Sequence, residues 1–448
     1  MCRLVIIFFI AALADLPALF ADEQPSEPLE AAKLLVARMA AGQFDKAIEA
    51  FEPTMKQVMP EAKLKDVWDG LTSQYGPLLR ATETRATKAK QYELVFVTCE
   101  FRRGKLAAKV VFTADNKITG LFFVPSGTYK PPPYADPSKF EEQELPVGHG
   151  LWSVPGTLSL PKGDGPFPAV VLVHGSGPQD RDETIGPNKP FRDLAHGLAP
   201  QGIAVLRYEK RTKEHPTLMA LSANTITVKE ETIDDALAAV EALSSEKKID
   251  TSRIFVLGHS LGGSVLPRIG QGNPSVAGFI SLAGSTRPLE EIVLEQVRYV
   301  LSLNGTLTDE DQKKLDDLER QVANVKSPTL SEKTPSSELP LGIPASYWLD
   351  LRKYDPATAA TELMKPMLFL QGERDYQVTM EDFTGWKKAL AQRKDVAFIS
   401  YPRLNHLFIE GEGKSTPAEY STPGNVAKVV IDDVAKWIEA FAARATDR

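Results

Sequence analysis

From about residue 167 onward, short apolar runs alternate with helical patterns, and this alternation limits the fold more than any other feature of the sequence. The apolar runs are continuous and β-rich, which is typical of strands buried on both faces of a sheet. They read FPAVVLV (167–173), IAVLRY (203–208), IFVLG (254–258), VAGFISLAG (276–284), PMLFLQG (366–372) and VAFISY (396–401). Repeated strand–helix units predict an α/β fold with a mostly parallel sheet and helices on both faces.

Helical patterns lie between these runs. We expect helices at 191–200, at 228–243, directly after residue 260, at 381–393 and at 424–443. In a parallel sheet the ligand lies beyond the carboxyl ends of the strands, so the chemistry is expected in the loops that follow them.

One insertion, about residues 286–360, breaks the alternation. It holds two helical patterns, LEEIVLEQVRYVLSL and DEDQKKLDDLERQVANV, and then a Ser/Pro-rich loop. Such a segment can act as a lid over the carboxyl edge of the sheet. A helical addition with no role in binding fits the same pattern, and the sequence leaves both readings open.

The chain of 448 residues is too long for one ordinary domain of roughly 100–200 residues. Residues 28–51 show a helical pattern that Gly42 can divide, and a second helical pattern follows Pro60. Three β-rich runs come next: YELVFVTCEF, KLAAKVVF and ITGLFFV. Helices followed by an antiparallel meander predict a small α+β domain over 22–128.

Four prolines in SGTYKPPPYADPSKF then make the chain stiff and unable to join a sheet interior. We therefore expect a linker at 129–140 and the α/β domain at 141–448.

The first residues resemble a secretory signal. Arg3 precedes the apolar run LVIIFFIAALADLPALFA, which ends in small residues at Ala21. This pattern predicts a signal peptide at 1–21 and a secreted or periplasmic protein. An uncleaved N-terminal membrane anchor is the alternative, although Asp15 leaves less than the ~20 apolar residues of a spanning helix.

Charge and cysteine content exclude several functions. The net charge is −7 and no Lys/Arg block is present, which argues against nucleic acid as a partner. The two cysteines, Cys2 and Cys99, provide neither a disulfide framework nor a Cys-based zinc site. No cofactor or metal is expected, and the oligomeric state is left open.

The strongest chemical signal is GHSLGG at 258–263, directly after a predicted strand. In a G-x-S-x-G turn, glycines at the positions of Gly258 and Gly262 allow a sharp strand-to-helix turn that exposes the serine, here Ser260. The N–H group of Leu261 then points toward the site, where it can stabilise an oxyanion. The alternative is a glycine-rich turn without chemistry.

A serine nucleophile needs a base and an acid. Of the six histidines only His406, in SYPRLNHLF, follows the last predicted strand. Asp375, in QGERD, follows the strand before it and would orient the imidazole, with Glu373 as a competitor. The resulting order Ser260, Asp375, His406 is that of an α/β-hydrolase triad.

A second oxyanion donor should come from the loop after an early strand. The sequence HGSG at 174–177 follows such a strand, and we assign the donor to Ser176 first and Gly177 second. We expect His174 to orient this loop and His259 to point away from Ser260. Polar side chains follow at once, and they either bind a polar substrate group or cap the loop: Gln179, Asp180, Arg181 and Asp182.

Together the HGSGPxDRD loop, the strand ending in Arg207-Tyr208, GHSLGG, QGERD and LNH make residues 140–446 resemble a secreted bacterial α/β-hydrolase of the serine esterase type, similar to prolyl-aminopeptidase-like hydrolases. The EFRRG and NKITGLFF segments make the N-terminal region resemble a small cone-shaped α+β domain of unknown function. The first resemblance implies hydrolysis of a small carboxylic ester through an acyl-enzyme. Two alternatives remain: a peptidase or amidase that uses the same triad on short peptides, and a binding protein on a hydrolase scaffold.

Overall fold

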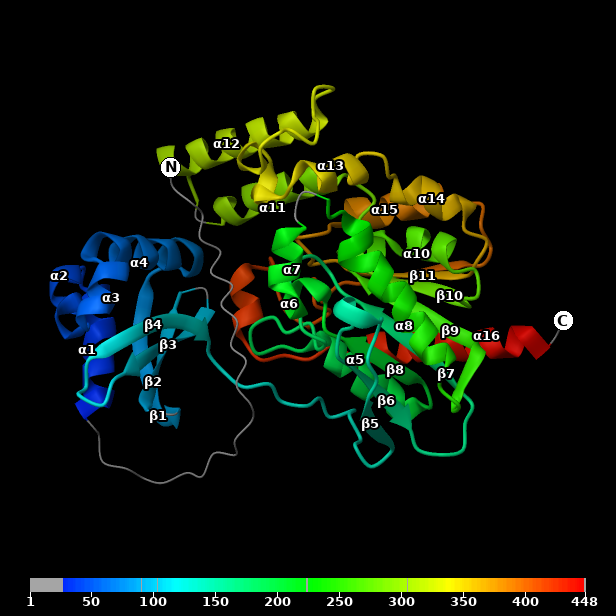
Figure 1. Ribbon diagram of the computed structural model, residues 1–448, viewed down its shortest axis with the longest axis horizontal. Coiled ribbons are helices and arrows are strands. Elements are labelled where there is room, and N and C mark those ends of the chain that lie inside the picture. The colour runs from blue at the N-terminus through cyan, green and yellow to red at the C-terminus, as the bar shows by residue number, and fades with distance from the viewer. Residues whose placement is uncertain (1–26, 90, 103, 223–224, 304, 447–448) are drawn as a thin grey trace. The chain divides into compact units, whose positions relative to one another are not determined.

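The computed structural model describes residues 27–446 except 90, 103, 223–224 and 304 (Figure 1), so the expected signal peptide lies outside the described residues. Two sheets organise the chain: an N-terminal antiparallel sheet of order β1-β2-β3-β4, and an eight-stranded sheet of order β12-β11-β10-β9-β7-β8-β6-β5.

The N-terminal sheet follows a group of helices, as expected for an α+β domain. Its elements are α1 (Glu27–Ala40), α2 (Phe44–Ala47), α3 (Pro53–Val58), α4 (Glu61–Tyr75), β1 (Leu78–Ala89), β2 (Tyr92–Phe101), β3 (Gly104–Phe112) and β4 (Ile118–Pro125). Gly42 lies between α1 and α2 with φ 72°, a left-handed conformation that favours glycine. Strand β1 was not expected, because LLRATETRATKA carries charged side chains and has no fully buried position.

The eight-stranded sheet is mostly parallel, which confirms the predicted α/β fold. Its strands are β5 (Phe140–Glu144), β6 (Gly156–Pro161), β7 (Phe167–Val173), β8 (Ala204–Tyr208), β9 (Ile249–His259), β10 (Gly278–Leu282), β11 (Met367–Gly372) and β12 (Val396–Tyr401). Strands β7 to β12 pair in parallel, whereas β6 runs antiparallel to β8 and β5 antiparallel to β6. The two antiparallel strands were not expected, because FEEQE is short and charged, and GTLSLP, although buried at every position, has no continuous apolar run.

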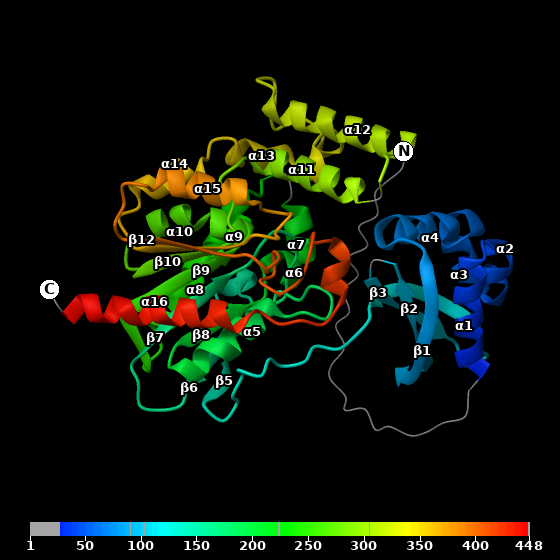
Figure 2. The same cartoon turned by 180° about the vertical axis from the view of Figure 1, so that it is seen from behind.

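Helices cover both faces of this sheet. They are α5 (Pro190–Leu198), α8 (Asp234–Ser244), α9 (Leu261–Ser264), α10 (Leu266–Gly272), α15 (Met380–Ala389) and α16 (Lys428–Thr446). Two short helices, α6 (Arg211–Glu214) and α7 (Pro216–Leu221), follow β8. Helix α8 crosses the near face in Figure 1, and α16 crosses the opposite face in Figure 2. Adjacent strand residues serve different cores: Phe279 packs with α8, α10 and α15, and Ile280 packs with α5 and α16. Burial on both faces explains the continuous apolar runs.

The insertion contains more helix than the two patterns predict. Its helices are α11 (Leu289–Ser302), α12 (Asp309–Lys326), α13 (Ala345–Leu351) and α14 (Pro356–Glu362). Thr308 and Asp311 form a capping box at the start of α12. Trp348 of α13 is fully buried against Val325 of α12 and Leu339, so the insertion has a small core of its own. In both ribbon views α11, α12 and α13 lie together beside the sheet.

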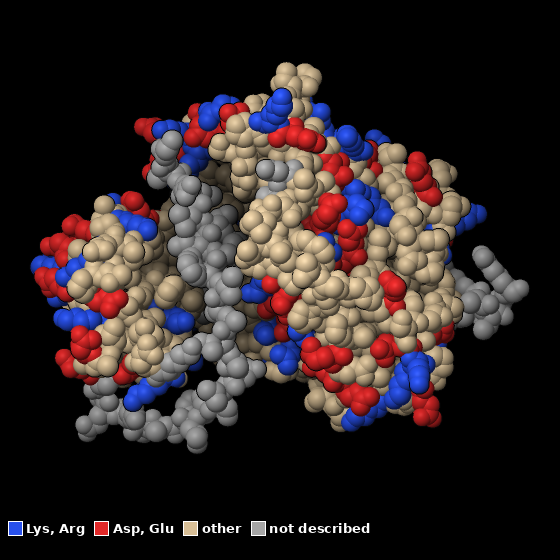
Figure 3. Space-filling model, in the orientation of Figure 1, with Lys and Arg blue, Asp and Glu red and all other residues tan. Residues whose placement is uncertain are grey.

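On the face drawn in Figure 3, acidic and basic side chains are interspersed. No described helix combines the length and the apolar character needed to cross a membrane.

Candidate active site

Ser260 lies at a sharp turn between β9 and α9. Its backbone has φ 54° and ψ −118°, a conformation that is rare for a residue with a side chain. Its N–H group donates a hydrogen bond to the carbonyl oxygen of Leu282 at the end of β10 (2.8 Å), and its own carbonyl oxygen accepts one from the Ser264 N–H (3.1 Å). Hydrogen bonds on both sides hold this strained residue in place.

Close backbone approach explains the glycines around Ser260. A Cβ atom on Gly258 would lie 2.3 Å from the carbonyl carbon of Gly262. A Cβ atom on Gly262 would lie 2.3 Å from the carbonyl oxygen of Val173, at the end of β7. Both separations are far below van der Waals contact, so these two positions of the G-x-S-x-G pattern have no room for a side chain.

The loops after β11 and β12 bring an acid and a base together. Nδ1 of His406 lies 2.6 Å from Oδ2 of Asp375, and both side chains are buried. The other carboxylate oxygen, Oδ1, accepts hydrogen bonds from the N–H groups of Gln377 (2.7 Å) and Val378 (3.1 Å). The competing Glu373 is exposed, and its Oε1 accepts a hydrogen bond from the Ser400 hydroxyl (2.8 Å).

The ring of His406 lies against the serine turn. Its centroid is 4.6 Å from that of His259, the residue that precedes Ser260. Among the described residues the hydrogen bonds include none between Ser260 Oγ and His406 Nε2. Such catalytic hydrogen bonds are often long in ligand-free enzymes and shorten when substrate binds.

The loop after β7 packs directly on the nucleophile turn. A Cβ atom on Gly175 would lie 3.2 Å from the Cβ of Ser260. The Gly175 N–H is already engaged, because it donates a hydrogen bond to Oε1 of Glu183 (2.8 Å). Within the described part of the chain, the N–H groups of Leu261, Ser176 and Gly177 have no hydrogen-bond acceptor. These three groups are therefore available to an oxyanion.

Two further histidines near the site, His174 and His259, contact its loops. His174 Nε2 lies 3.0 Å from the carbonyl oxygen of Asp180, and burial lowers the pKa of His174 to about 4, so its neutral ring holds the loop. His259 Nδ1 lies 2.9 Å from Oε2 of the buried Glu183, and its Nε2 lies 2.9 Å from the carbonyl oxygen of His406. Sequence reasoning did not find Glu183.

The polar residues that follow the loop are engaged within the protein. Oδ1 of Asp180 accepts hydrogen bonds from the N–H groups of Asp182 (3.2 Å) and Thr184 (2.8 Å). Asp182 forms ion pairs with the buried Arg207 and with Lys189 (3.0 Å). Two further side chains are held nearby: Gln179 donates to the Ser176 carbonyl oxygen (3.2 Å), and Arg181 pairs with Glu209 (2.8 Å). These contacts cap the loop and anchor it to its neighbours.

The insertion contacts the loop that carries the acid. The ring of Tyr299 in α11 stacks on Tyr376, next to Asp375, with centroids 4.9 Å apart. Nε2 of Gln296, also in α11, donates a hydrogen bond to the carbonyl oxygen of Gln377 (3.0 Å). The insertion is thus part of the surroundings of the acid.

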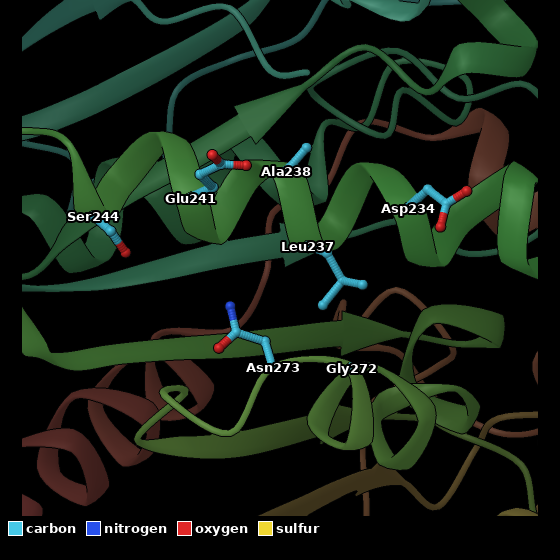
Figure 4. Close-up of a pocket in the computed structure, with 7 residues that line it drawn as sticks. All are labelled: Asp234, Leu237, Ala238, Glu241, Ser244, Gly272 and Asn273. Carbon is cyan, nitrogen blue, oxygen red and sulfur yellow. The ribbon is translucent and has the colours of Figure 1, made fainter. Parts of the chain in front are cut away.

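A surface hollow lies away from this constellation. Figure 4 shows it between α8 and the end of α10, and its lining residues are Asp234, Leu237, Ala238, Glu241, Ser244, Gly272 and Asn273. Ser260, Asp375 and His406 do not line it. Within residues 27–446, apart from the five omitted positions, no cluster of three or more His, Cys, Asp or Glu residues is arranged to hold a metal ion.

Two family models match this architecture. Residues 166–413, more than half of the chain, match the family described as "Serine aminopeptidase, S33". The chain belongs to this α/β-hydrolase family. The membership confirms the resemblance inferred from the sequence motifs. Residues 32–121 match a family described as "Protein of unknown function (DUF3887)", so the hydrolase carries an N-terminal domain of unknown function, as also expected.

This α/β-hydrolase is similar over nearly its whole length to one characterised protein. Esterase EstD of Thermotoga maritima is 41% identical over 410 residues, which cover 90% of this chain and 94% of that protein. Among solved structures, acylaminoacyl peptidase of Pyrococcus horikoshii is 15% identical, with a TM-score of 0.46 over 80% of this chain and 56% of that one. Est1E of Butyrivibrio proteoclasticus is also 15% identical, with a TM-score of 0.43 over 67% of this chain and 99% of that one.

Proposed function

We propose that this α/β-hydrolase is a carboxylic ester hydrolase that acts through Ser260, His406 and Asp375. One observation supports ester hydrolysis as the reaction: the chain shares 41% identity with an esterase across 94% of that protein. The geometry supports the residue assignment, because the strained Ser260 turn and the His406–Asp375 pair occupy the carboxyl ends of β9, β11 and β12.

In the proposed reaction Ser260 Oγ attacks the ester carbonyl carbon while His406 Nε2 takes its proton. The N–H groups of Leu261 and Ser176, or Gly177 in its place, bind the oxyanion. When the intermediate collapses, His406 delivers the proton to the leaving alcohol and an acyl-enzyme forms. His406 then removes a proton from water, which attacks the acyl carbon and frees Ser260. Asp375 keeps the proton of His406 on Nδ1 and stabilises the imidazolium.

The test is hydrolysis of short- and medium-chain p-nitrophenyl esters, measured beside aminoacyl anilides, by the wild type and by Ser260→Ala. Ester turnover that disappears in Ser260→Ala supports the proposal, and the preferred chain length then measures the acyl pocket. Dominant anilide turnover contradicts it.

An aminopeptidase is the second candidate, because the matching family is described as a serine aminopeptidase. Such an enzyme needs a free carboxylate to bind the substrate amino group. The carboxylates closest in sequence to the oxyanion loop, Asp180 and Asp182, are engaged by backbone N–H groups, Arg207 and Lys189. The ester reading is therefore preferred. A non-catalytic binding protein, the third reading, would resist labelling by a fluorophosphonate.

We also propose that residues 1–21 direct export, which makes the mature protein secreted or periplasmic. The apolar run that ends at Ala21 supports this proposal. Mass determination of the protein from its native host tests it: loss of 21 residues is expected, and an intact, membrane-bound chain would indicate an anchor.

We also propose a division of the chain into a small domain at 22–128, a linker at 129–140 and the hydrolase domain at 141–448. Limited proteolysis tests this division, because cleavage is expected in the linker.

A further inference from the structure

Lys210 places a buried ammonium group against the oxyanion loop. It follows β8 in the sequence RYEKR, and only 1% of its surface is exposed. Its Nζ donates hydrogen bonds to the carbonyl oxygen of Gly175 (2.8 Å) and to Oε1 of Glu231 (2.7 Å). Its backbone N–H also donates to the carbonyl oxygen of Gln179 (3.1 Å), so Lys210 holds the loop at both ends.

The contact with Gly175 bears directly on Ser176. The carbonyl of Gly175 and the N–H of Ser176 belong to one planar trans peptide unit, and they point in opposite directions. A fixed ammonium on the carbonyl therefore fixes the direction of the N–H. It also polarises the amide, which strengthens that N–H as a donor in a site of low dielectric constant. The preceding peptide is fixed separately, by the bond from the Gly175 N–H to Glu183.

Glu231 connects this contact to the insertion. It lies in a π-helical segment, Lys229–Ile233, a rare conformation that is frequent at functional sites. Its second oxygen, Oε2, accepts a hydrogen bond from the hydroxyl of Tyr347 in α13 (2.6 Å). A continuous buried chain thus runs from Tyr347 through Glu231 and Lys210 to Gly175.

The next residue provides an internal comparison. Arg211 is also buried and pairs with Asp235, four residues after Glu231, through Nε–Oδ2 (2.8 Å) and a second hydrogen bond. Within the described residues both of its side-chain hydrogen bonds go to that carboxylate. Lys210 differs, because it reaches the main chain of the loop beside Ser260.

We propose that Lys210 is a positioning residue that orients and polarises the Gly175–Ser176 peptide and thereby makes the Ser176 N–H the second oxyanion donor. Glu231 and Tyr347 hold the ammonium in place. The inference rests on the proposed esterase function, and it selects Ser176 over Gly177.

The experiment compares p-nitrophenyl butyrate with its thiono analogue, in which sulfur replaces the carbonyl oxygen. A thiono ester develops its charge on a large sulfur atom that N–H donors stabilise poorly, so its turnover depends little on the oxyanion hole. For Lys210→Met we expect kcat/KM for the oxo ester to fall about 10- to 100-fold, which is less than the loss expected when a donor is removed outright. We expect kcat/KM for the thiono ester to fall much less. The ratio of the two kcat/KM values, oxo over thiono, should therefore decrease. Arg211→Met, the matched control, should leave the oxo/thiono ratio unchanged. An equal loss for both esters in Lys210→Met, or no loss, overturns the proposal.

The double variant Lys210→Met/Glu231→Gln separates positioning from folding. Removing both charges avoids a buried unpaired carboxylate, so its Tm should exceed that of Lys210→Met while the oxo/thiono ratio stays low. A ratio that returns to the wild-type value as Tm recovers shows a purely structural role and overturns the proposal. Wild-type turnover of the oxo ester tests the underlying function separately, and its absence would remove the basis of both proposals.

Discussion

The imidazole of His259 joins Glu183 to the main chain of His406. Nδ1 of His259 lies 2.9 Å from Glu183 Oε2, and its Nε2 lies 2.9 Å from the carbonyl oxygen of His406. Because Glu183 also accepts the Gly175 N–H, one buried carboxylate ties the oxyanion loop to the loop of the base. Two parts of the site that are more than 200 residues apart in sequence are thereby held together.

The Glu183–His259 pair gives stability a pH dependence. Burial disfavours the charged form of each residue, but the opposite charge outweighs burial, so the pKa of His259 is raised from 6.5 and that of Glu183 is lowered from 4.5. The contribution of His259 is therefore complete below pH 6.5 and is lost as pH rises through its folded-state pKa. The contribution of Glu183 is complete above pH 4.5 and is lost as pH falls through its own folded-state value.

Glu183→Gln should accordingly lower Tm most between pH 4.5 and 6.5, with a smaller difference from the wild type in alkaline solution. Thermal unfolding of both proteins at about pH 5.5 and about pH 9 measures this difference. A difference that stays constant or grows toward alkaline pH would contradict a charged pair.

Asp375→Asn should reduce kcat for ester hydrolysis about 10³- to 10⁴-fold with little change in Tm. The amide keeps the shape of the carboxylate, but it favours the wrong tautomer of His406 and cannot stabilise the imidazolium. Steady-state kinetics with a p-nitrophenyl ester measures the loss. Glu373→Gln is the matched control; because Glu373 is exposed, its kcat should stay within about twofold of the wild type. Equal losses in the two variants would show that the acid is misassigned.

Gly258→Ala should destabilise the hydrolase part of the chain by about 1–3 kcal/mol and lower its activity, because the new methyl group meets the backbone of Gly262. Gly70→Ala makes the same chemical change on the exposed surface of α4, where nothing lies within 4 Å of the added carbon. There the change should stabilise the helix by about 0.5–1 kcal/mol. Scanning calorimetry of both variants checks whether Gly258→Ala lowers and Gly70→Ala raises the stability relative to the wild type. Tolerance of alanine at Gly258 would disprove the steric account of the turn.

The sequence predicted the strands that read as continuous apolar runs. Strands β7 to β12 have such runs, so they stand out and their order implies a parallel sheet. Burial alone does not decide this, because β6 is buried at every position but polar residues interrupt its leucines, whereas the predicted β12 is only partly buried. Strands β1 and β5 are exposed at most positions and carry charges, so periodicity does not distinguish them from loops. They form because neighbouring strands satisfy their backbone hydrogen bonds, a tertiary effect that local patterns do not contain.

In the candidate site, the sequence predicted the triad residues that follow strands. It did not predict the buried residues that hold the loops of the site in position. Ser260, Asp375 and His406 each follow a recognisable strand in the expected order. Glu183, Lys210 and Glu231 act through buried contacts between distant segments, and no spacing rule brings them together. One signal was present: Lys210 is a charged residue two positions after the end of the buried strand β8, at the edge where parallel sheets place their ligands.

Ser260 as the nucleophile is the central claim, and covalent labelling tests it most directly. The mature protein is treated with a fluorophosphonate, digested, and mapped by mass spectrometry in parallel with residual activity on a p-nitrophenyl ester. We expect one phosphonyl group on the peptide that contains Ser260, loss of activity in proportion to labelling, and no label on folded Ser260→Ala. Full ester turnover by Ser260→Ala, or inactivation with the label on another residue, would contradict the assignment.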